Sequence, residues 1–185
     1  MLIGISGKKG SGKDTLASMM NAHFKEHDGP GCIFQRKQFA AKIKEMSAVL
    51  IGCAVSDLED QIFKTSPVFH LNSKSPREIL QKLGTEFGRR MLYEDVWVDS
   101  TLATYNDLKN WIVTDCRFPN EIEAIKARGG IVIRIEGRGS KPTLPRFVRW
   151  LYTKLGIPLH GVNHPSETAL DNYRDWDYVG SNEGS

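Results

Sequence analysis

Apolar and polar positions fall into blocks whose spacing predicts strands alternating with helices. Residues 2–6 form an unbroken apolar run typical of a buried strand, and residues 13–27 carry apolar side chains at helical spacing. The same pattern places further strands at 32–38, 111–114, 131–135 and 176–179, and further helices at 41–51, 76–91, 95–105 and 120–128. Strands that alternate with helices predict an α/β fold with a mostly parallel sheet flanked by helices.

Two serines are each followed by glutamate three residues later, which is the capping-box signal for a helix N-terminus. Ser75 and Glu78 predict the start of the 76–91 helix, whereas Ser56 and Glu59 predict a short helix. The stretch 64–74 is polar, and we expect it to be irregular. In the longer helix, the apolar side chains expected to face the core are Ile79, Leu80, Leu83 and Phe87.

A glycine-rich turn separates the first strand from the first helix. Its sequence, GKKGSGK, matches the spacing of a phosphate loop. Glycines let backbone N–H groups point at an anion, the new helix adds the positive end of its dipole, and Lys13 adds a charge that can reach the β- and γ-phosphates. The alternative is a plain turn without a ligand. The candidate ATP-binding residues are Gly7, Lys8, Gly10, Ser11, Gly12, Lys13, Asp14 and Thr15.

The position after the loop lysine departs from the usual pattern. Asp14 stands where serine or threonine is usual, and Thr15 follows it. The usual hydroxyl binds magnesium, so we expect Thr15 and Asp14 to hold Mg²⁺, in part through water. The alternative role of Asp14 is to complement the positive end of the helix dipole.

A second polar group follows the apolar run 111–114. Asp115 leaves the end of this predicted strand, and Arg117 and Glu121 come shortly after it. Open α/β sheets bind their ligands at the carboxyl ends of their strands. Two interpretations stay open: Asp115 and Arg117 contact a ligand, or they only pair with each other at the surface.

The predicted helix at 76–91 also has a polar face. Arg77, Gln81 and Thr85 recur every four residues, with Gly84 beside them, so they share one side of an α-helix. This pattern indicates either a solvated face or a place where a ligand approaches closely. Trp97 in the following helix is either a core residue or a stacking surface for a flat ligand.

Residues 136–164 differ from the rest of the chain in composition. Glycine and proline are frequent, and basic residues interleave with Trp150 and Tyr152 around a predicted helix at 146–155. We interpret the stretch from about 137 to 163 as a lid insertion that closes over the site. A nucleic-acid-binding patch is the alternative.

The remaining composition favours a cytoplasmic protein. The chain has 185 residues, 40% of them hydrophobic and 25% charged, and a formal net charge of +3, which suits an anionic ligand but does not argue for nucleic acid. No apolar stretch is long enough to span a membrane. A strand pattern follows Met1 directly, so we expect no signal peptide. Three cysteines without C-x-x-C spacing (Cys32, Cys53 and Cys116) indicate reduced thiols.

Over most of its length, the chain resembles the deoxynucleoside monophosphate kinases of bacteriophages. The similarity is carried by Gly12-Lys13-Asp14-Thr15, by the grouping of Arg77, Gln81, Gly84-Thr85 and Trp97, and most specifically by TDCRFPNE at 114–121 followed by Gly129-Gly130. The stretch His164-x-Ser166-Glu167 is a weaker match.

The resemblance implies a single P-loop kinase domain over residues 1–185, with a three-layer fold and the lid insertion. Its implied activity is the phosphorylation of deoxynucleoside monophosphates to diphosphates with ATP and Mg²⁺. The residues implied to hold the acceptor are Arg77, Gln81, Gly84, Thr85, Trp97, Asp115, Arg117 and Glu121. The implied catalytic residues are Lys13, Asp14, Asp115, Arg117 and the lid residue Arg138. Besides the acceptor nucleotide, a second copy in a homodimer is left open as a partner.

Three other functions remain open at this point. A P-loop kinase with another small acceptor, of the dephospho-coenzyme A or phosphomevalonate type, would share the loop but would not need the grouping of Arg77 with Trp97. A nucleotide-binding module without phosphoryl transfer would use the basic insertion to hold a partner. A nucleic-acid-stimulated NTPase would use the same insertion to bind single strands.

Overall fold

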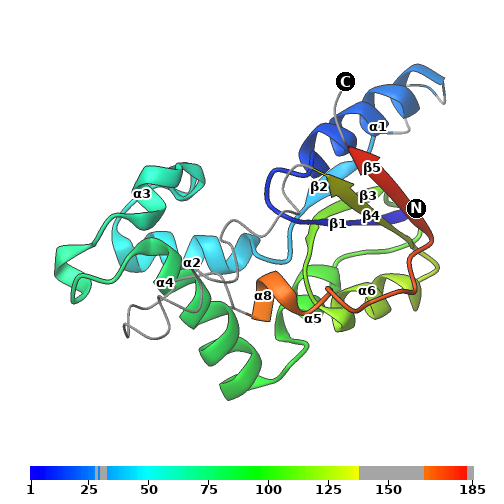
Figure 1. Ribbon diagram of the computed structural model, residues 1–185. Coiled ribbons are helices and arrows are strands. Elements are labelled where there is room, and N and C mark those ends of the chain that lie inside the picture. The colour runs from blue at the N-terminus through cyan, green and yellow to red at the C-terminus, as the bar shows by residue number, and fades with distance from the viewer. Residues whose placement is uncertain (28, 30–32, 138–164, 183–185) are drawn as a thin grey trace, which may run out of the picture. The chain divides into compact units, whose positions relative to one another are not determined.

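The computed structural model describes residues 1–27, 29, 33–137 and 165–182 (Figure 1). Its internal contacts divide the chain into two compact units, one formed by Met1–Arg36 with Asn106–Ser185 and the other by Lys37–Tyr105. Within the described ranges, no helix has both the length and the apolar character needed to cross a bilayer. A single kinase domain over 1–185 stays a prediction.

The first unit is organised on a five-stranded sheet with the order β2-β3-β1-β4-β5. Strand β1 pairs in parallel with β3 and β4, and β5 pairs in parallel with β4, which confirms the predicted α/β fold. The strands are β1 (Leu2–Gly7), β2 (Gln35–Lys37), β3 (Trp111–Cys116), β4 (Ile131–Gly137) and β5 (Tyr178–Asn182).

Helices pack on both faces of this sheet. The helices among the described residues of the unit are α1 (Lys13–His27), α6 (Pro119–Lys126) and α8 (Pro165–Thr168). Because alternate residues of a strand point to opposite faces, Ile3 and Ile5 face one side of β1 and Gly4 faces the other. The α1 side chains pack against the cluster that contains Ile3 and Ile5, while Ile125 of α6 packs directly on Gly4. The three-layer arrangement follows from this division.

The described part of the second unit is helical. Its core contains Ala48, Ile51 and Leu58, all no more than 5% exposed. The elements are α2 (Ala41–Ile51), η1 (Val55–Glu59), α3 (Gln61–Thr65), η2 (Phe69–Leu71), α4 (Pro76–Gln81), η3 (Lys82–Leu92) and α5 (Val96–Leu102).

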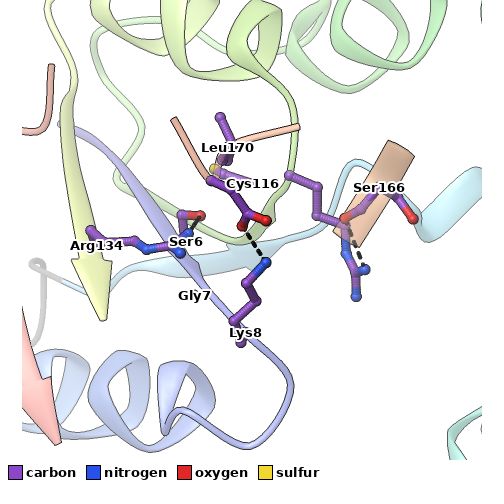
Figure 2. Close-up of a pocket in the computed structure, with 9 residues that line it drawn as sticks. Ser6, Gly7, Lys8, Cys116, Arg134, Ser166 and Leu170 are labelled. Carbon is purple, nitrogen blue, oxygen red and sulfur yellow. Dashed lines mark hydrogen bonds and ion pairs between the residues drawn. The ribbon is translucent and has the colours of Figure 1, made fainter. Parts of the chain in front are cut away.

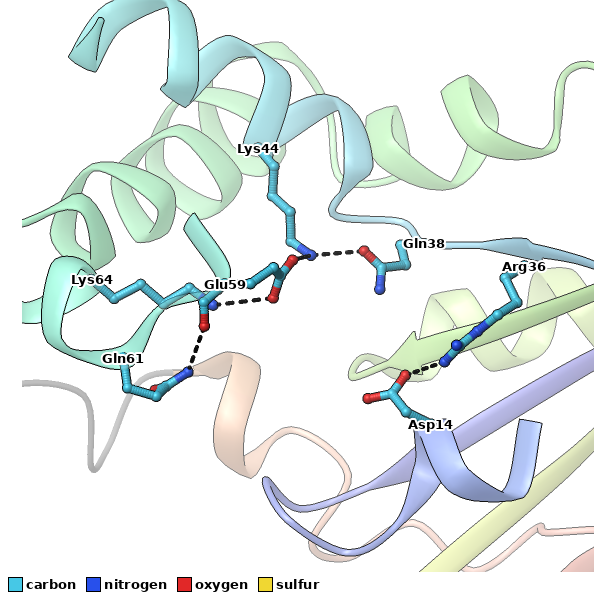
Figure 3. A network of polar contacts seen from close by, with 7 residues as sticks. All are labelled: Asp14, Arg36, Gln38, Lys44, Glu59, Gln61 and Lys64. Carbon is cyan, nitrogen blue, oxygen red and sulfur yellow. Dashed lines mark hydrogen bonds and ion pairs between the residues drawn. The ribbon is translucent and has the colours of Figure 1, made fainter. Parts of the chain in front are cut away.

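Glu59 links three of these elements through two lysines (Figure 3). Its carboxylate lies 2.6 Å from Lys44 Nζ of α2 and 3.5 Å from Lys64 Nζ of α3. Partial burial opposes ionisation, but the hydrogen bond and charge of Lys44, together with Lys64, lower the pKa of Glu59. The stabilisation from this network is therefore present above the ordinary glutamate pKa and is lost as the pH falls through the lowered value.

Two strand boundaries differ from the expectation. The strand predicted from Cys32 to just before Phe39 contains β2 but starts too early, because among the described residues pairing begins where the Gln35 N–H donates to the Asn110 carbonyl oxygen at 2.8 Å. Its apolar signal came from the segment before the edge strand, where Phe34 is buried beneath α1. The last strand also begins later than 176–179. Asp177 instead binds the Val132 N–H at 2.7 Å, just ahead of β5.

The predicted helix at 76–91 is confirmed in extent but not in form. The Ser75 N–H donates to Glu78 Oε2 at 2.8 Å and the Glu78 N–H donates to Ser75 Oγ at 3.3 Å, so the capping box is confirmed. From Lys82 onward the chain is a π-helix, whose wider i→i+5 turns rotate later positions off an α-helical stripe. The prediction that Phe87 faces the core is wrong, since its side chain is 37% exposed.

The helix boundaries predicted elsewhere in the second unit agree less well with the structure. The capping box predicted at Ser56 is wrong, because the short helix begins at Val55 and Asp57 accepts the Ala54 N–H at 2.9 Å. Helix α3 occupies the start of the stretch expected to be irregular. The helix expected at 95–105 ends at Leu102.

Gly88 of η3 lies against Trp97 of α5. A Cβ at this position would lie only 2.5 Å from ring atoms Cε2 and Cζ2 of Trp97. Trp97 is 5% exposed, and its indole N–H donates to the Gly84 carbonyl oxygen at 2.8 Å. The ring is therefore buried and fixed against η3 by this hydrogen bond, so it cannot easily move away from a methyl group added at Gly88.

We expect Gly88→Ala to lower the free energy of unfolding by about 1–3 kcal/mol, because the added methyl group overpacks a filled site. Glu86→Ala on the same helix is the control, since Glu86 is exposed and forms a surface ion pair with Lys82; it should change the value by less than ~0.5 kcal/mol. Denaturant titrations of both variants measure the difference. Equal stabilities would mean that Trp97 does not occupy this place.

Candidate nucleotide-binding site

The glycine-rich turn has the geometry of a phosphate loop. Strand β1 ends at Gly7 and α1 begins at Lys13, as the sequence predicts. Gly10 and Gly12 have φ of 78° and 93°, values that side chains disfavour. The Gly12 carbonyl oxygen accepts the Leu16 N–H at 2.9 Å, so Gly12 stands at the helix N-terminus. The positive end of the α1 dipole therefore faces the loop, as an anion-binding site requires.

Lys13 folds back across this loop. Its Nζ donates to the Lys8 carbonyl oxygen at 2.9 Å, and the side chain is half-buried. The Ser11 N–H binds the same carbonyl oxygen at 3.1 Å, which closes the loop around it. The ammonium group is thus held at the loop, where it can meet a bound phosphate.

Ser11 explains why the loop begins with glycine. The serine is 1% exposed, and among the described residues its Oγ has no hydrogen-bond partner. A Cβ on Gly7 would lie 2.5 Å from that oxygen. Any larger residue at position 7 would therefore displace the loop.

The two residues after Lys13 are exposed on the first turn of α1. Asp14 forms an ion pair with Arg36 of β2 (Figure 3), which the sequence did not indicate because Arg36 belongs to no motif. Both Asp14 and Thr15 present oxygen atoms, which are the donors that Mg²⁺ prefers. The donor types therefore fit the expected metal, although the described residues include no group of three or more His, Cys, Asp or Glu side chains that could hold one.

The end of β3 meets the loop in a small cavity of about 20 Å³ (Figure 2). Three cationic side chains reach it. Lys8 forms an ion pair with Asp171, Arg117 Nη1 donates to the Ser166 carbonyl oxygen at 3.4 Å, and Arg134 Nη1 donates to Ser6 Oγ at 3.2 Å. The lining residues are Ser6, Gly7, Lys8, Cys116, Arg117, Arg134, Ser166, Leu170 and Asp171. This surrounding is suited to an anion.

Sequence reasoning missed Arg134 and Asp171. Arg134 is the charged residue inside the apolar run of β4, and that interruption was a usable signal. Asp171 has no local signal, because only the fold brings it to Lys8.

Glu121 has a structural function in this part of the site. It is 3% exposed, and its Oε2 accepts the Arg117 N–H at 2.6 Å and the Phe118 N–H at 3.1 Å. These bonds fix the turn between β3 and α6 and so orient the backbone that carries Arg117. Direct contact of Glu121 with an acceptor stays a prediction.

Asp115 and Cys116 are the last two residues of β3. Asp115 is half-buried near the carboxyl end of the strand, as the sequence predicts. Burial raises the pKa of the Cys116 thiol well above its usual range, and the charges of Glu121 and Asp115 raise it further. Cys116 is therefore a neutral thiol and not a nucleophile.

The remaining candidates for the acceptor lie in the second unit. Arg77 Nη2 lies 3.5 Å from Gln61 Oε1, and Gln81 stands one α-helical turn further on. Thr85 lies in the π-helical segment that follows Gln81. Gly84 and Trp97 are brought together by the bond between the indole N–H and the carbonyl oxygen. Arg138, His164 and the lid predicted beyond Gly137 lie outside the described residues.

A phosphate loop at the end of the central strand of a parallel sheet defines a P-loop nucleotide-binding protein. The chain is 30% identical, over an alignment of 197 positions, to the mimivirus protein (Acanthamoeba polyphaga mimivirus) named "Putative deoxynucleotide monophosphate kinase", covering 97% of this chain and 86% of the relative. It is 26% identical over 181 positions to the deoxynucleoside-5'-monophosphate kinase of Escherichia phage T5, covering 68% of this chain and 72% of the relative. No family model matches the chain. The chain belongs to the deoxynucleoside monophosphate kinase family.

We expect Glu121→Ala to lower the free energy of unfolding by about 1–3 kcal/mol, because two N–H groups lose a charged acceptor. Glu121→Gln keeps one acceptor oxygen, so its free energy of unfolding should fall by less than that of Glu121→Ala. Glu123→Ala is the control, since Glu123 is exposed on the same helix. Chemical denaturation of the three variants ranks them. The capping function is refuted if Glu121→Ala is as stable as Glu123→Ala.

Proposed function

We propose that the protein transfers the γ-phosphoryl group of ATP to a deoxynucleoside monophosphate. A phosphate oxygen of the acceptor forms a bond to the γ-phosphorus, the bond between that phosphorus and the bridging oxygen breaks, and ADP and a deoxynucleoside diphosphate leave. The observation that supports the proposal most directly is the loop between β1 and α1, across which Lys13 is held by its bond to the Lys8 carbonyl oxygen. The family to which the chain belongs gives the same direction.

On the donor side, the loop binds the phosphates of ATP. Backbone N–H groups of residues 7–13 and the start of α1 face the β-phosphate, and Lys13 neutralises charge on the β- and γ-phosphates. Thr15 and Asp14 would hold Mg²⁺, in part through water. That ion supplies neutralising charge to the phosphate oxygens.

Arg117 and Arg138 assist the group in transfer. Arg117 reaches the cavity beside Lys8, so its guanidinium can grip the phosphoryl group from the side of β3. Asp115, two residues earlier, would orient the acceptor or, when Mg²⁺ is bound, the water around that ion. Arg138 adds a further cation from the predicted lid, and closure of that lid excludes the water that would otherwise hydrolyse ATP.

On the acceptor side, we assign the group on α4, η3 and α5. Arg77 offers a planar fork for the monophosphate, with Gln81, Gly84 and Thr85 along the same helix and Glu121 at the turn after β3. Trp97 offers a ring for the base. Because that ring is only 5% exposed, stacking requires part of it to become accessible when the acceptor binds.

A coupled assay of ADP release over the four deoxynucleoside monophosphates tests the proposal. We expect ADP formation with at least one of them, and comparison with the ribonucleotides reports selection at the sugar. Dephospho-coenzyme A and phosphomevalonate should be inactive, and single-stranded DNA should not stimulate ATP hydrolysis. Absence of transfer to every deoxynucleotide would refute the assignment.

The viral origin of the two relatives supports action in a host cytoplasm. A homodimer remains a prediction, and light scattering can check it.

We expect Lys13→Ala to leave the fold intact and to lower turnover by at least ~10²-fold, because a charge-stabilising group at the transferred phosphate is lost. Lys9→Ala is the control, because Lys9 belongs to the loop but is not assigned to phosphate binding. Steady-state kinetics and circular dichroism give the two readouts. Near-normal turnover in a folded Lys13→Ala variant would exclude the loop as the donor site.

We expect Arg117→Lys and Asp115→Asn to lower turnover with little change in melting temperature. Lysine keeps the charge of Arg117 but not its bidentate fork, and asparagine keeps the shape of Asp115 without its charge. Arg128→Lys and Asp107→Asn, at exposed positions in the same unit, serve as matched controls. A loss of stability with turnover preserved would show that the two residues only support the fold.

A further inference from the structure

Asn182 is the last residue of the edge strand β5, and its side chain reaches the phosphate loop. Its Nδ2 donates to the Ser11 carbonyl oxygen at 3.0 Å. It also lies against Gly12, where a Cβ would come within 2.6 Å of the same nitrogen. The side-chain amide is therefore packed directly behind the peptide that joins Ser11 to Gly12.

The pairing of β4 with β5 brings Asn182 to this place. Gly137 is the register partner of Asn182, and it has a φ of 151°. A Cβ at Gly137 would collide with the Asn182 carbonyl oxygen and would lie 2.9 Å from its carbonyl carbon. Glycine at the end of β4 thus lets β5 approach closely enough for its last side chain to reach the loop.

A hydrogen bond to the carbonyl oxygen of a peptide also fixes the direction in which the N–H of that peptide points. The trans peptide is planar, so the Ser11 carbonyl and the Gly12 N–H point in opposite directions. Gly10 and Gly12, which flank Ser11, have no Cβ, so side-chain clashes do not prevent rotation of the backbone next to this peptide. Without a fixed partner for the Ser11 carbonyl, this peptide can turn its oxygen toward a bound anion, which would repel it.

We propose that Asn182 is a positioning residue of the phosphate loop. Its amide holds the Ser11 carbonyl outward, and the Gly12 N–H consequently faces the phosphate chain of ATP. Asn182 acts through this peptide and does not touch the transferred group. The inference depends on the proposed binding of ATP by the loop, and it adds a determinant that lies about 170 residues away in sequence.

The test compares ATP with inorganic tripolyphosphate, which has the phosphates but no nucleoside. Calorimetric titration of Asn182→Ala should show both ligands bound about three- to ten-fold more weakly than by the wild type, the loss expected for one hydrogen bond. Asn182→Asp should bind both still more weakly, because its carboxylate repels the Ser11 carbonyl and the anion. Ser181→Ala is the control, since Ser181 precedes Asn182 and its side chain points to the opposite face of the strand. This variant should bind both ligands as tightly as the wild type does.

Three results would overturn the proposal. Unchanged affinity for tripolyphosphate in Asn182→Ala would show that the side chain does not act on the loop. Wild-type affinity in Asn182→Asp, which has the same shape, would show that the residue only fills space. Failure of the wild-type protein to bind tripolyphosphate would remove the anion site altogether. Because Asn182→Asp preserves the packing, it tests the proposal even if the alanine variant unfolds.

The kinase assignment fails by a different observation. Tripolyphosphate binding that follows the expected order, in a protein that phosphorylates no deoxynucleotide, would refute the proposed function and leave the action of Asn182 supported. Transfer of phosphate to a deoxynucleotide, together with unchanged tripolyphosphate binding in both Asn182 variants, would support the proposed function and refute the action of Asn182.

Discussion

The site depends on a single constraint, which is that the loop after β1 must present its N–H groups to one anion while both of its ends are fixed. Strand β1 is buried on both faces, and α1 is packed on the sheet, so neither end can move to relieve strain. The loop therefore needs small residues for separate reasons. Gly7 leaves room for the Ser11 hydroxyl, whereas Gly10 and Gly12 provide backbone angles that side chains disfavour.

The parallel sheet places the other charged groups around this loop. Carboxyl ends of parallel strands share one edge, so β1, β3 and β4 bring their last residues together although they are far apart in sequence. Lys8, Arg117 and Arg134 reach one cavity, and Asp171 offsets part of their charge. The site is thus assembled by strand order, and no local segment of the chain contains it.

This origin explains what the sequence could predict. The phosphate loop, the Ser75 capping box and the strand end at Asp115 depend on neighbouring residues, and the structure has each of them. The π-helical turn that exposes Phe87 and the late start of β2 at Gln35 depend on packing and pairing with distant segments. The capping function of Glu121 was within reach, since it stands three residues after Phe118 at a helix start, but the residue was interpreted only as a ligand contact. The contacts of Asp171 and Asn182 with the loop have no local signature.

The burial of Cys116 has a consequence for how this site can be studied. Its neutral thiol, enclosed at the end of β3, can react with an alkylating reagent only when this edge of the sheet opens. The rate of its modification therefore reports the frequency of local opening beside the loop. The chain thus carries a native label for fluctuations beside the phosphate loop, once the modification of Cys116 is resolved from that of Cys32 and Cys53.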